Sequence, residues 1–146
     1  MITHVYGPVE GRRHDWTLYT RSLLEEKLPP LLDVEGERYC LYGDSGYSRR
    51  WFLEVPYQGS NLTSAQRAFN RAMSAVRITV EWIFKEVKLY FTTMDYKRKL
   101  KVKESPVGML YMSAMLLCNM RNCIYPNQIA RYFDCTPPSL EQFLLN

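Results

Sequence analysis

The sequence predicts a mixed α/β fold in a single domain, and three observations lead to this prediction. The chain has 146 residues, and its 47% hydrophobic and 23% charged side chains are typical of a globular protein. Segments with strand-like and helix-like spacing of apolar residues follow one another along it. No apolar run reaches the roughly 18–20 residues of a membrane span, so we expect no membrane partner.

The first half of the chain predicts two short strands and one helix between them. Residues 2–6 (ITHVY) are rich in β-prone side chains, so we expect a strand there. Residues 15–28 have helical spacing, and the proline pair at 29–30 should end that helix. Residues 38–43 (RYCLYG) predict a buried strand, followed by a sharp turn at residues 44–46 (DSG).

Helices dominate the second half of the chain. Thr63 and Gln66 have the spacing of a capping box, and the periodic pattern after them predicts a helix over residues 63–91. A second helix is expected over residues 106–123, and the last twenty residues should pack back onto the body. Two strands make a small sheet for so much helix, so we expect part of the sheet to be missing.

Positive charge is concentrated in one segment. Residues 61–103 carry ten basic and three acidic side chains, whereas the formal net charge of the whole chain is +4. Part of this excess belongs to a basic connector at residues 97–103. The asymmetry favours a polyanion, above all nucleic acid, as the partner, and a solvated basic face is the alternative.

A helical wheel of residues 65–91 separates an apolar arc from a basic arc. The apolar arc consists of Phe69, Met73, Val76, Val80, Ile83, Phe84, Val87 and Phe91. The basic arc consists of Arg67, Arg71, Arg77, Lys85 and Lys88. Glu81 is the one carboxylate within the basic arc. Two interpretations of Glu81 stay open: an i,i+4 partner of the neighbouring cations, or a metal-binding or catalytic acid beside phosphate-binding cations.

Two further carboxylates are candidate site residues. Asp44 ends a predicted strand, where ligands gather in open α/β sheets, and an ordinary turn aspartate is the alternative. Asp15 stands at a predicted helix start, where an N-cap or a first-turn acid favoured by the helix dipole is the alternative.

Four motifs, taken in order, resemble the Harbinger-type transposase-derived nucleases of the DDE superfamily. The motifs are residues 7–15 (GPVEGRRHD), 42–47 (YGDSGY), 69–84 (FNRAMSAVRITVEWIF) and the group Leu116, Leu117 and Asn119. The resemblance covers nearly the whole chain. It implies a ribonuclease-H-like mixed sheet with flanking helices and a divalent-metal-dependent DNA endonuclease.

The resemblance also implies a role for each acid. Asp44 and Glu81 resemble the second and third catalytic acids, and Asp15 resembles a metal ligand. Asp15, Asp44 and Glu81 would then converge to hold Mg²⁺ or Mn²⁺, and a complete site would cleave DNA by a two-metal mechanism. The cations that would hold the DNA backbone are Arg12, Arg13, Arg77, Lys85, Lys88, Lys97, Arg98, Lys99, Lys101 and Lys103.

One departure from the family concerns the first catalytic Asp. In the family this Asp lies on a strand well upstream of the GRRHD motif, whereas only six residues precede Gly7 in this sequence. We therefore expect a partial, N-terminally truncated domain over residues 1–146 that lacks the first strands, and its enzymatic activity stays open. The alternatives are a non-catalytic DNA- or protein-binding remnant of a domesticated transposase, or a chain completed by a partner protein or a homo-oligomer. We expect a nuclear location, or a cytoplasmic one before import.

Overall fold

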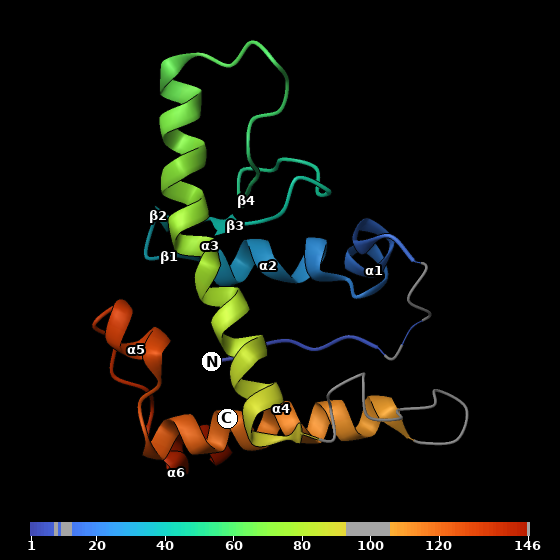
Figure 1. Cartoon of the computed structure of the whole chain (residues 1–146), viewed down its shortest axis with the longest axis vertical. Helices are drawn as coiled ribbons and strands as arrows, with labels where there is room; N and C mark the ends of the chain where they lie inside the picture. Colours follow the sequence, from blue (N-terminus) through green and yellow to red (C-terminus); the bar gives the residue numbers. More distant parts are fainter. Residues whose placement is uncertain (8, 10–12, 93–105, 146) are drawn as a thin grey trace. The chain divides into compact units, whose positions relative to one another are not determined.

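The computed structural model describes residues 1–7, 9, 13–92 and 106–145. These residues form six helices and four two-residue strands, a mixed α/β arrangement as predicted (Figure 1). They divide into two compact units, one made of Met1–Pro8 with Ile78–Asn146 and the other of Val9–Arg77. The ribonuclease-H-like sheet and the single domain stay predictions. Within the described ranges, no helix is long and apolar enough to cross a membrane.

The Val9–Arg77 unit has two helices where the sequence predicts one. α1 (Asp15–Arg21) ends at Ser22, whose hydroxyl donates to the carbonyl of Tyr19 over 2.7 Å. Leu23 then takes a left-handed conformation with φ 58°, which turns the chain before α2 (Leu24–Leu32) begins.

The prediction that the proline pair ends a helix is wrong, because Pro29 and Pro30 lie inside α2. Each proline removes one backbone hydrogen bond, but its fixed φ near −65° is itself helical. α2 therefore continues for two residues beyond the pair before it ends at Leu32.

The strands of this unit form two small sheets. β1 (Asp33–Val34) pairs antiparallel with β2 (Glu37–Arg38), and β3 (Leu41–Tyr42) pairs parallel with β4 (Leu53–Glu54). The prediction of one buried strand over residues 38–43 is wrong, because this stretch is divided between β2 and β3 and both are exposed.

The hairpin turn between β1 and β2 explains this division. Glu35 and Gly36 have φ values of 53° and 85°, and two successive positive φ angles are what a tight hairpin turn requires. Because of this turn, residues 37–38 pair with β1 as β2. Residues 41–42 form a separate strand, β3, which pairs with β4.

The core of the Val9–Arg77 unit gathers around Tyr19, Phe52 and Leu53. Trp16 stacks on Tyr19 with ring centroids 5.4 Å apart, and Tyr47 meets Tyr19 edge-on at 5.6 Å. The segment that follows the GRRHD motif is thereby packed against the turn that carries Asp44.

The long helix α3 (Ser64–Tyr90) begins as predicted, at a capping box. The backbone N–H of Thr63 donates to the side-chain oxygen of Gln66 over 2.9 Å, and the N–H of Gln66 donates to the Thr63 hydroxyl over 3.2 Å. The two side chains thus satisfy two N–H groups at the start of the helix.

The predicted apolar arc of α3 is buried only in part. Met73, Ile83 and Val87 are buried, whereas Val80 and Phe84 are 50% and 43% exposed. An arc of about 100° is wider than the strip that neighbouring elements cover in the described part of the chain, so Val80 and Phe84 stay exposed.

The Met1–Pro8 and Ile78–Asn146 unit is built on α4 (Val107–Ile124), which confirms the helix predicted for residues 106–123. After α4 come α5 (Gln128–Tyr132) and α6 (Leu140–Leu145), and α6 packs on α4. The prediction that the tail packs back onto the body is thereby confirmed.

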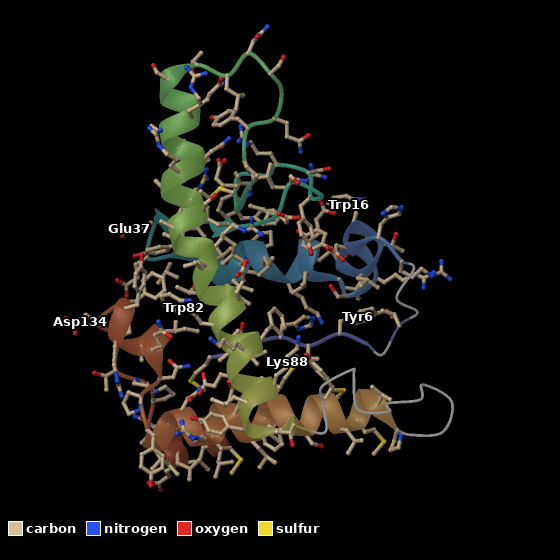
Figure 2. All side chains as sticks on the ribbon, viewed as in Figure 1. Tyr6, Trp16, Glu37, Trp82, Lys88 and Asp134 are labelled. Carbon is tan, nitrogen blue, oxygen red and sulfur yellow. The ribbon has the colours of Figure 1, made fainter. Side chains whose placement is uncertain are left out.

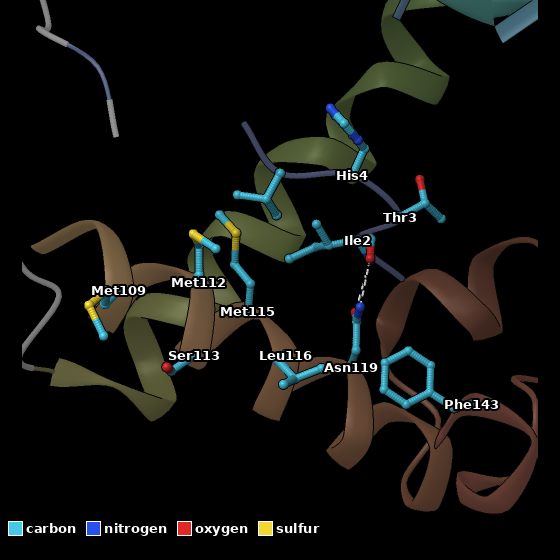
Figure 3. A pocket seen from close by; sticks show the side chains of 11 residues that line it. Ile2, Thr3, His4, Met109, Met112, Ser113, Met115, Leu116, Asn119 and Phe143 are labelled. Carbon is cyan, nitrogen blue, oxygen red and sulfur yellow. Dashed lines mark hydrogen bonds between the residues drawn. The ribbon is translucent and has the colours of Figure 1, made fainter. Parts of the chain in front are cut away.

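Residues 2–6 do not form the predicted strand, because they run extended without a strand partner in the described part of the chain. The side chain of Asn119 binds the backbone of Ile2, near the start of this segment. The N–H of Ile2 donates to Asn119 Oδ1 over 2.9 Å, and Asn119 Nδ2 donates to the Ile2 carbonyl over 2.6 Å (Figure 3). The Asn119 amide thus takes the place of a neighbouring strand for these two groups.

Candidate active site

Asp44 opens the tight turn that follows β3. The carbonyl of Asp44 accepts from the N–H of Tyr47 over 3.1 Å, which closes the turn. Gly43 precedes it and donates to the Glu54 carbonyl over 2.8 Å. A Cβ on Gly43 would lie 3.0 Å from Leu53 Cδ1, so the close packing of β4 explains glycine before the aspartate.

The carboxylate of Asp44 forms an ion pair with Arg77 of α3. Arg77 Nη2 lies 3.1 Å from Asp44 Oδ1, and the two side chains are 33% and 52% exposed. Arg77 is one of the predicted DNA-binding cations. In the structure the Arg77 guanidinium pairs with a carboxylate of the same unit. Its contact with DNA stays a prediction.

Asp15 and Asp44 both lie near the phenol of Tyr47. Burial raises the pKa of Tyr47, the charges of Asp15 and then Asp44 raise it further, and Arg77 lowers it. Both carboxylates therefore act on one phenol, although Asp15 begins α1 and Asp44 follows β3. The structure brings these two predicted site residues into one neighbourhood. Asp15 is also the first-turn acid of α1, as its alternative interpretation states.

The first half of α3 is fixed to this unit by residues whose role the sequence did not reveal. Asn70 accepts from the N–H of Tyr57 and donates to its carbonyl, each over 2.9 Å. Phe69 meets the rings of Tyr42 and Tyr57 edge-on at 6.4 and 5.4 Å. An asparagine directly after an apolar-arc residue is a signal that could have indicated such a bond.

Glu81 is an exposed residue of α3 in the other unit, so its meeting with Asp15 and Asp44 stays a prediction. Lys85, one turn further along the helix, does not pair with it within 4.0 Å in the described part of the chain. The simple i,i+4 ion pair between Glu81 and Lys85 is therefore absent. Lys85 and Lys88 are both exposed, as phosphate-binding side chains would be.

The donor chemistry of the predicted acids suits the expected metal, because Mg²⁺ and Mn²⁺ prefer carboxylate oxygens. Asp15 and Asp44 supply such oxygens, and both carboxylates act on the Tyr47 phenol. Among the residues that the structure describes, no three His, Cys, Asp or Glu side chains form a group that could hold a metal ion.

Several of the predicted DNA-binding cations lie outside the described residues. Arg13 is described and is exposed just before α1. The predicted cations that fall outside are Arg12, Lys97, Arg98, Lys99, Lys101 and Lys103.

A family model described as DDE superfamily endonuclease matches residues 1–119, a span that contains all three predicted acids. No curated protein and no solved structure matches the chain.

Proposed function

The chain belongs to the DDE superfamily endonucleases, and from this membership we propose that it is a Harbinger-type, transposase-derived domain for divalent-metal-dependent cleavage of DNA phosphodiester bonds. An endonuclease family implies a DNA substrate. The family match supports the proposal most directly, because it spans residues 1–119 and so contains all three predicted acids.

In this proposal Asp44 and Glu81 are the catalytic acids, and Asp15, Asp44 and Glu81 hold Mg²⁺ or Mn²⁺. When bound, such ions activate water and stabilise the leaving oxygen of an in-line displacement. The chain itself supplies the oxygen donors. Tyr47 keeps its proton at neutral pH, as a tyrosine with the ordinary pKa of about 10 does, and burial and the two aspartates raise its pKa further.

The basic side chains would hold the DNA backbone. Lys85 and Lys88 are exposed on α3, and the residues at 97–103 add five cations. Contacts of this kind carry no base specificity, so we expect binding that tolerates any sequence and weakens steeply with salt.

We treat residues 1–146 as part of one nuclease domain. Its site of action would be the nucleus.

A second candidate function is a non-catalytic DNA- or protein-binding remnant of a domesticated transposase. The observation that favours it is the ion pair between Asp44 and Arg77, because a carboxylate neutralised within the protein needs no metal ion. Metal binding separates the two candidates.

The test is a calorimetric Mn²⁺ titration of the whole chain and of Asp44→Asn and Glu81→Gln. The proposal predicts that Mn²⁺ binds and that each variant weakens binding about tenfold or more, because each removes a charged oxygen donor. Glu141→Gln, at an exposed position of α6, is the matched control and should bind as the parent does.

A parallel assay follows the nicking of supercoiled plasmid in Mg²⁺ or Mn²⁺. Any nicking above background should vanish in Asp44→Asn and in Glu81→Gln. Unchanged Mn²⁺ binding in both variants, or nicking that persists in both, would show that these acids are not the site.

A further inference from the structure

The unit of Met1–Pro8 and Ile78–Asn146 contains a cavity of about 680 Å³, and none of the three predicted acids lines it. Its walls come from the last part of α3, the end of α4, the connection at residues 125–127 and α5. This volume is within the range of about 300–1,000 Å³ that small-molecule sites occupy.

Arg121 lines this cavity and contacts two aromatic rings. Its guanidinium lies 4.2 Å from the centroid of the Tyr90 ring and 5.4 Å from that of Tyr125. Arg121 Nη1 also lies 3.8 Å from Glu86 Oε1. One planar cation is therefore held against two aromatic rings and one carboxylate.

A second set of bonds fixes the polar wall of the cavity. The Glu86 side chain is only 13% exposed, and its Oε2 accepts from Asn127 Nδ2 over 2.8 Å. Asn127 Oδ1 in turn accepts from the N–H of Ala130 in α5 over 3.0 Å. These polar atoms are thus held in place before any ligand arrives.

The rim of the cavity is aromatic and positively charged. Trp82 of α3 (Figure 2) lines it. The Trp82 ring meets the ring of Tyr132 in α5 edge-on at 5.5 Å. Lys85 and Arg131 also line it, are exposed, and have no ion-pair partner in the part of the chain that the structure describes. Since Glu86 offsets Arg121, these two cations leave the cavity with net positive charge.

Aromatic rings and cations around one cavity, with fixed polar groups in its wall, have the chemistry of a nucleotide site. We propose that this cavity binds one unpaired nucleotide of single-stranded DNA. The base stacks on the aromatic and guanidinium surfaces, its edge meets Glu86 and Asn127, and the phosphates lie toward Lys85 and Arg131. A base inside a duplex is already stacked and paired, so it cannot enter. The proposal rests on the proposed function, which makes DNA the substrate.

The test measures the binding of a fluorescent thymidine oligomer, and of a duplex of the same length, to the whole chain by fluorescence anisotropy. The first variant is Tyr125→Ala, because Tyr125 is 62% exposed and its removal should leave the fold intact. We expect an affinity loss of about tenfold for the single strand and less than about twofold for the duplex, since stacking requires an unpaired base.

Tyr39→Ala is the matched control, because Tyr39 is also a half-exposed tyrosine but belongs to the other unit. It should bind both oligomers as the parent chain does. A second variant, Lys85→Gln, should reduce the slope of log affinity against log salt by about 0.7 for the single strand, the loss of one phosphate contact.

Three results would overturn the proposal: no binding of the single strand by the parent chain at low salt, an unchanged single-strand affinity in Tyr125→Ala, or equal losses for single strand and duplex. Failure of the proposed nuclease function has a different readout. It leaves Mn²⁺ binding insensitive to Asp44→Asn and Glu81→Gln while the effect of Tyr125→Ala on the single strand persists.

Discussion

Arg77 and Asp44 form an ion pair of 3.1 Å that joins α3 to the turn after β3. Both residues belong to the motifs on which the family resemblance depends. The pair is partly exposed on both sides, so it contributes at most about 1 kcal/mol to stability. Its main consequence is electrostatic, because Arg77 places a positive charge where a metal ion on Asp44 would have to approach.

Arg77→Gln should therefore strengthen Mn²⁺ binding by several-fold. Removing a cation that lies 3.1 Å from the Asp44 carboxylate lowers the repulsion that an incoming divalent ion meets. Calorimetric titration measures the change, and urea unfolding should show a stability loss below about 1 kcal/mol.

Arg38→Gln is the matched control for this prediction. It removes an exposed ion pair with Asp33, 3.8 Å long, in the same unit. It should change neither Mn²⁺ affinity nor stability measurably. Weaker Mn²⁺ binding in Arg77→Gln would mean that Arg77 supports the site and does not compete with the metal.

The titration of Tyr47 reports whether Asp15 and Asp44 lie beside it. Each aspartate raises the pKa of the Tyr47 phenol, so Asp15→Asn and Asp44→Asn should each lower that pKa. Ultraviolet difference titration against Tyr47→Phe isolates this phenol from the other tyrosines. Asp33→Asn should have no effect, and a Tyr47 pKa that is the same in all three variants would place the two acids elsewhere.

Tyr47 also makes stability depend on pH in the alkaline range. Because its pKa is raised in the folded chain, its contribution is fully present below the unfolded value of about 10. The contribution is lost as the pH rises through the folded pKa. Urea unfolding at increasing pH should show a free energy that falls above pH 10, and the fall should be shallower in Tyr47→Phe.

Asn119→Leu should destabilise the chain by about 1–3 kcal/mol in urea unfolding. Asn119 is 5% exposed and makes both bonds to the Ile2 backbone, so its loss leaves an N–H and a carbonyl without their partner. Cleavage by a protease within residues 1–7 should also become faster.

Asn122→Leu is the control for the Asn119 variant. Asn122 is 1% exposed, and neither side-chain polar atom has a hydrogen-bond partner in the described part of the chain. Its replacement therefore removes no bond and should cost less. Equal losses in the two variants would show that the Asn119 amide contributes nothing specific.

Local sequence signals were sufficient to predict an element where the residues that determine its structure lie within the element itself. The start of α3 follows from Thr63 and Gln66, which bond to each other across one turn. α4 follows from an apolar run of sufficient length. The strand predicted for residues 2–6 was wrong. Local sequence could not show that the backbone of Ile2 binds Asn119, which is 117 residues away.

In the candidate site, too, some features were predictable from the sequence and others were not. Motif order singled out Asp15 and Asp44, and the structure places both beside one phenol. The pairing of Arg77 with Asp44 was not predictable, because it depends on how α3 packs on the turn after β3. The helical wheel shows which side of a helix is basic but not which of its cations a neighbouring segment will bind.

Mn²⁺-induced broadening of backbone amide resonances in the NMR spectrum of the whole chain measures whether Asp15, Asp44 and Glu81 share one metal centre. With a shared centre, the amides of residues 15, 44 and 81 broaden together at substoichiometric Mn²⁺, and Asp44→Asn removes the effect at all three. Broadening confined to residues 15 and 44, with Glu81 unaffected, would show that Glu81 is not part of the centre.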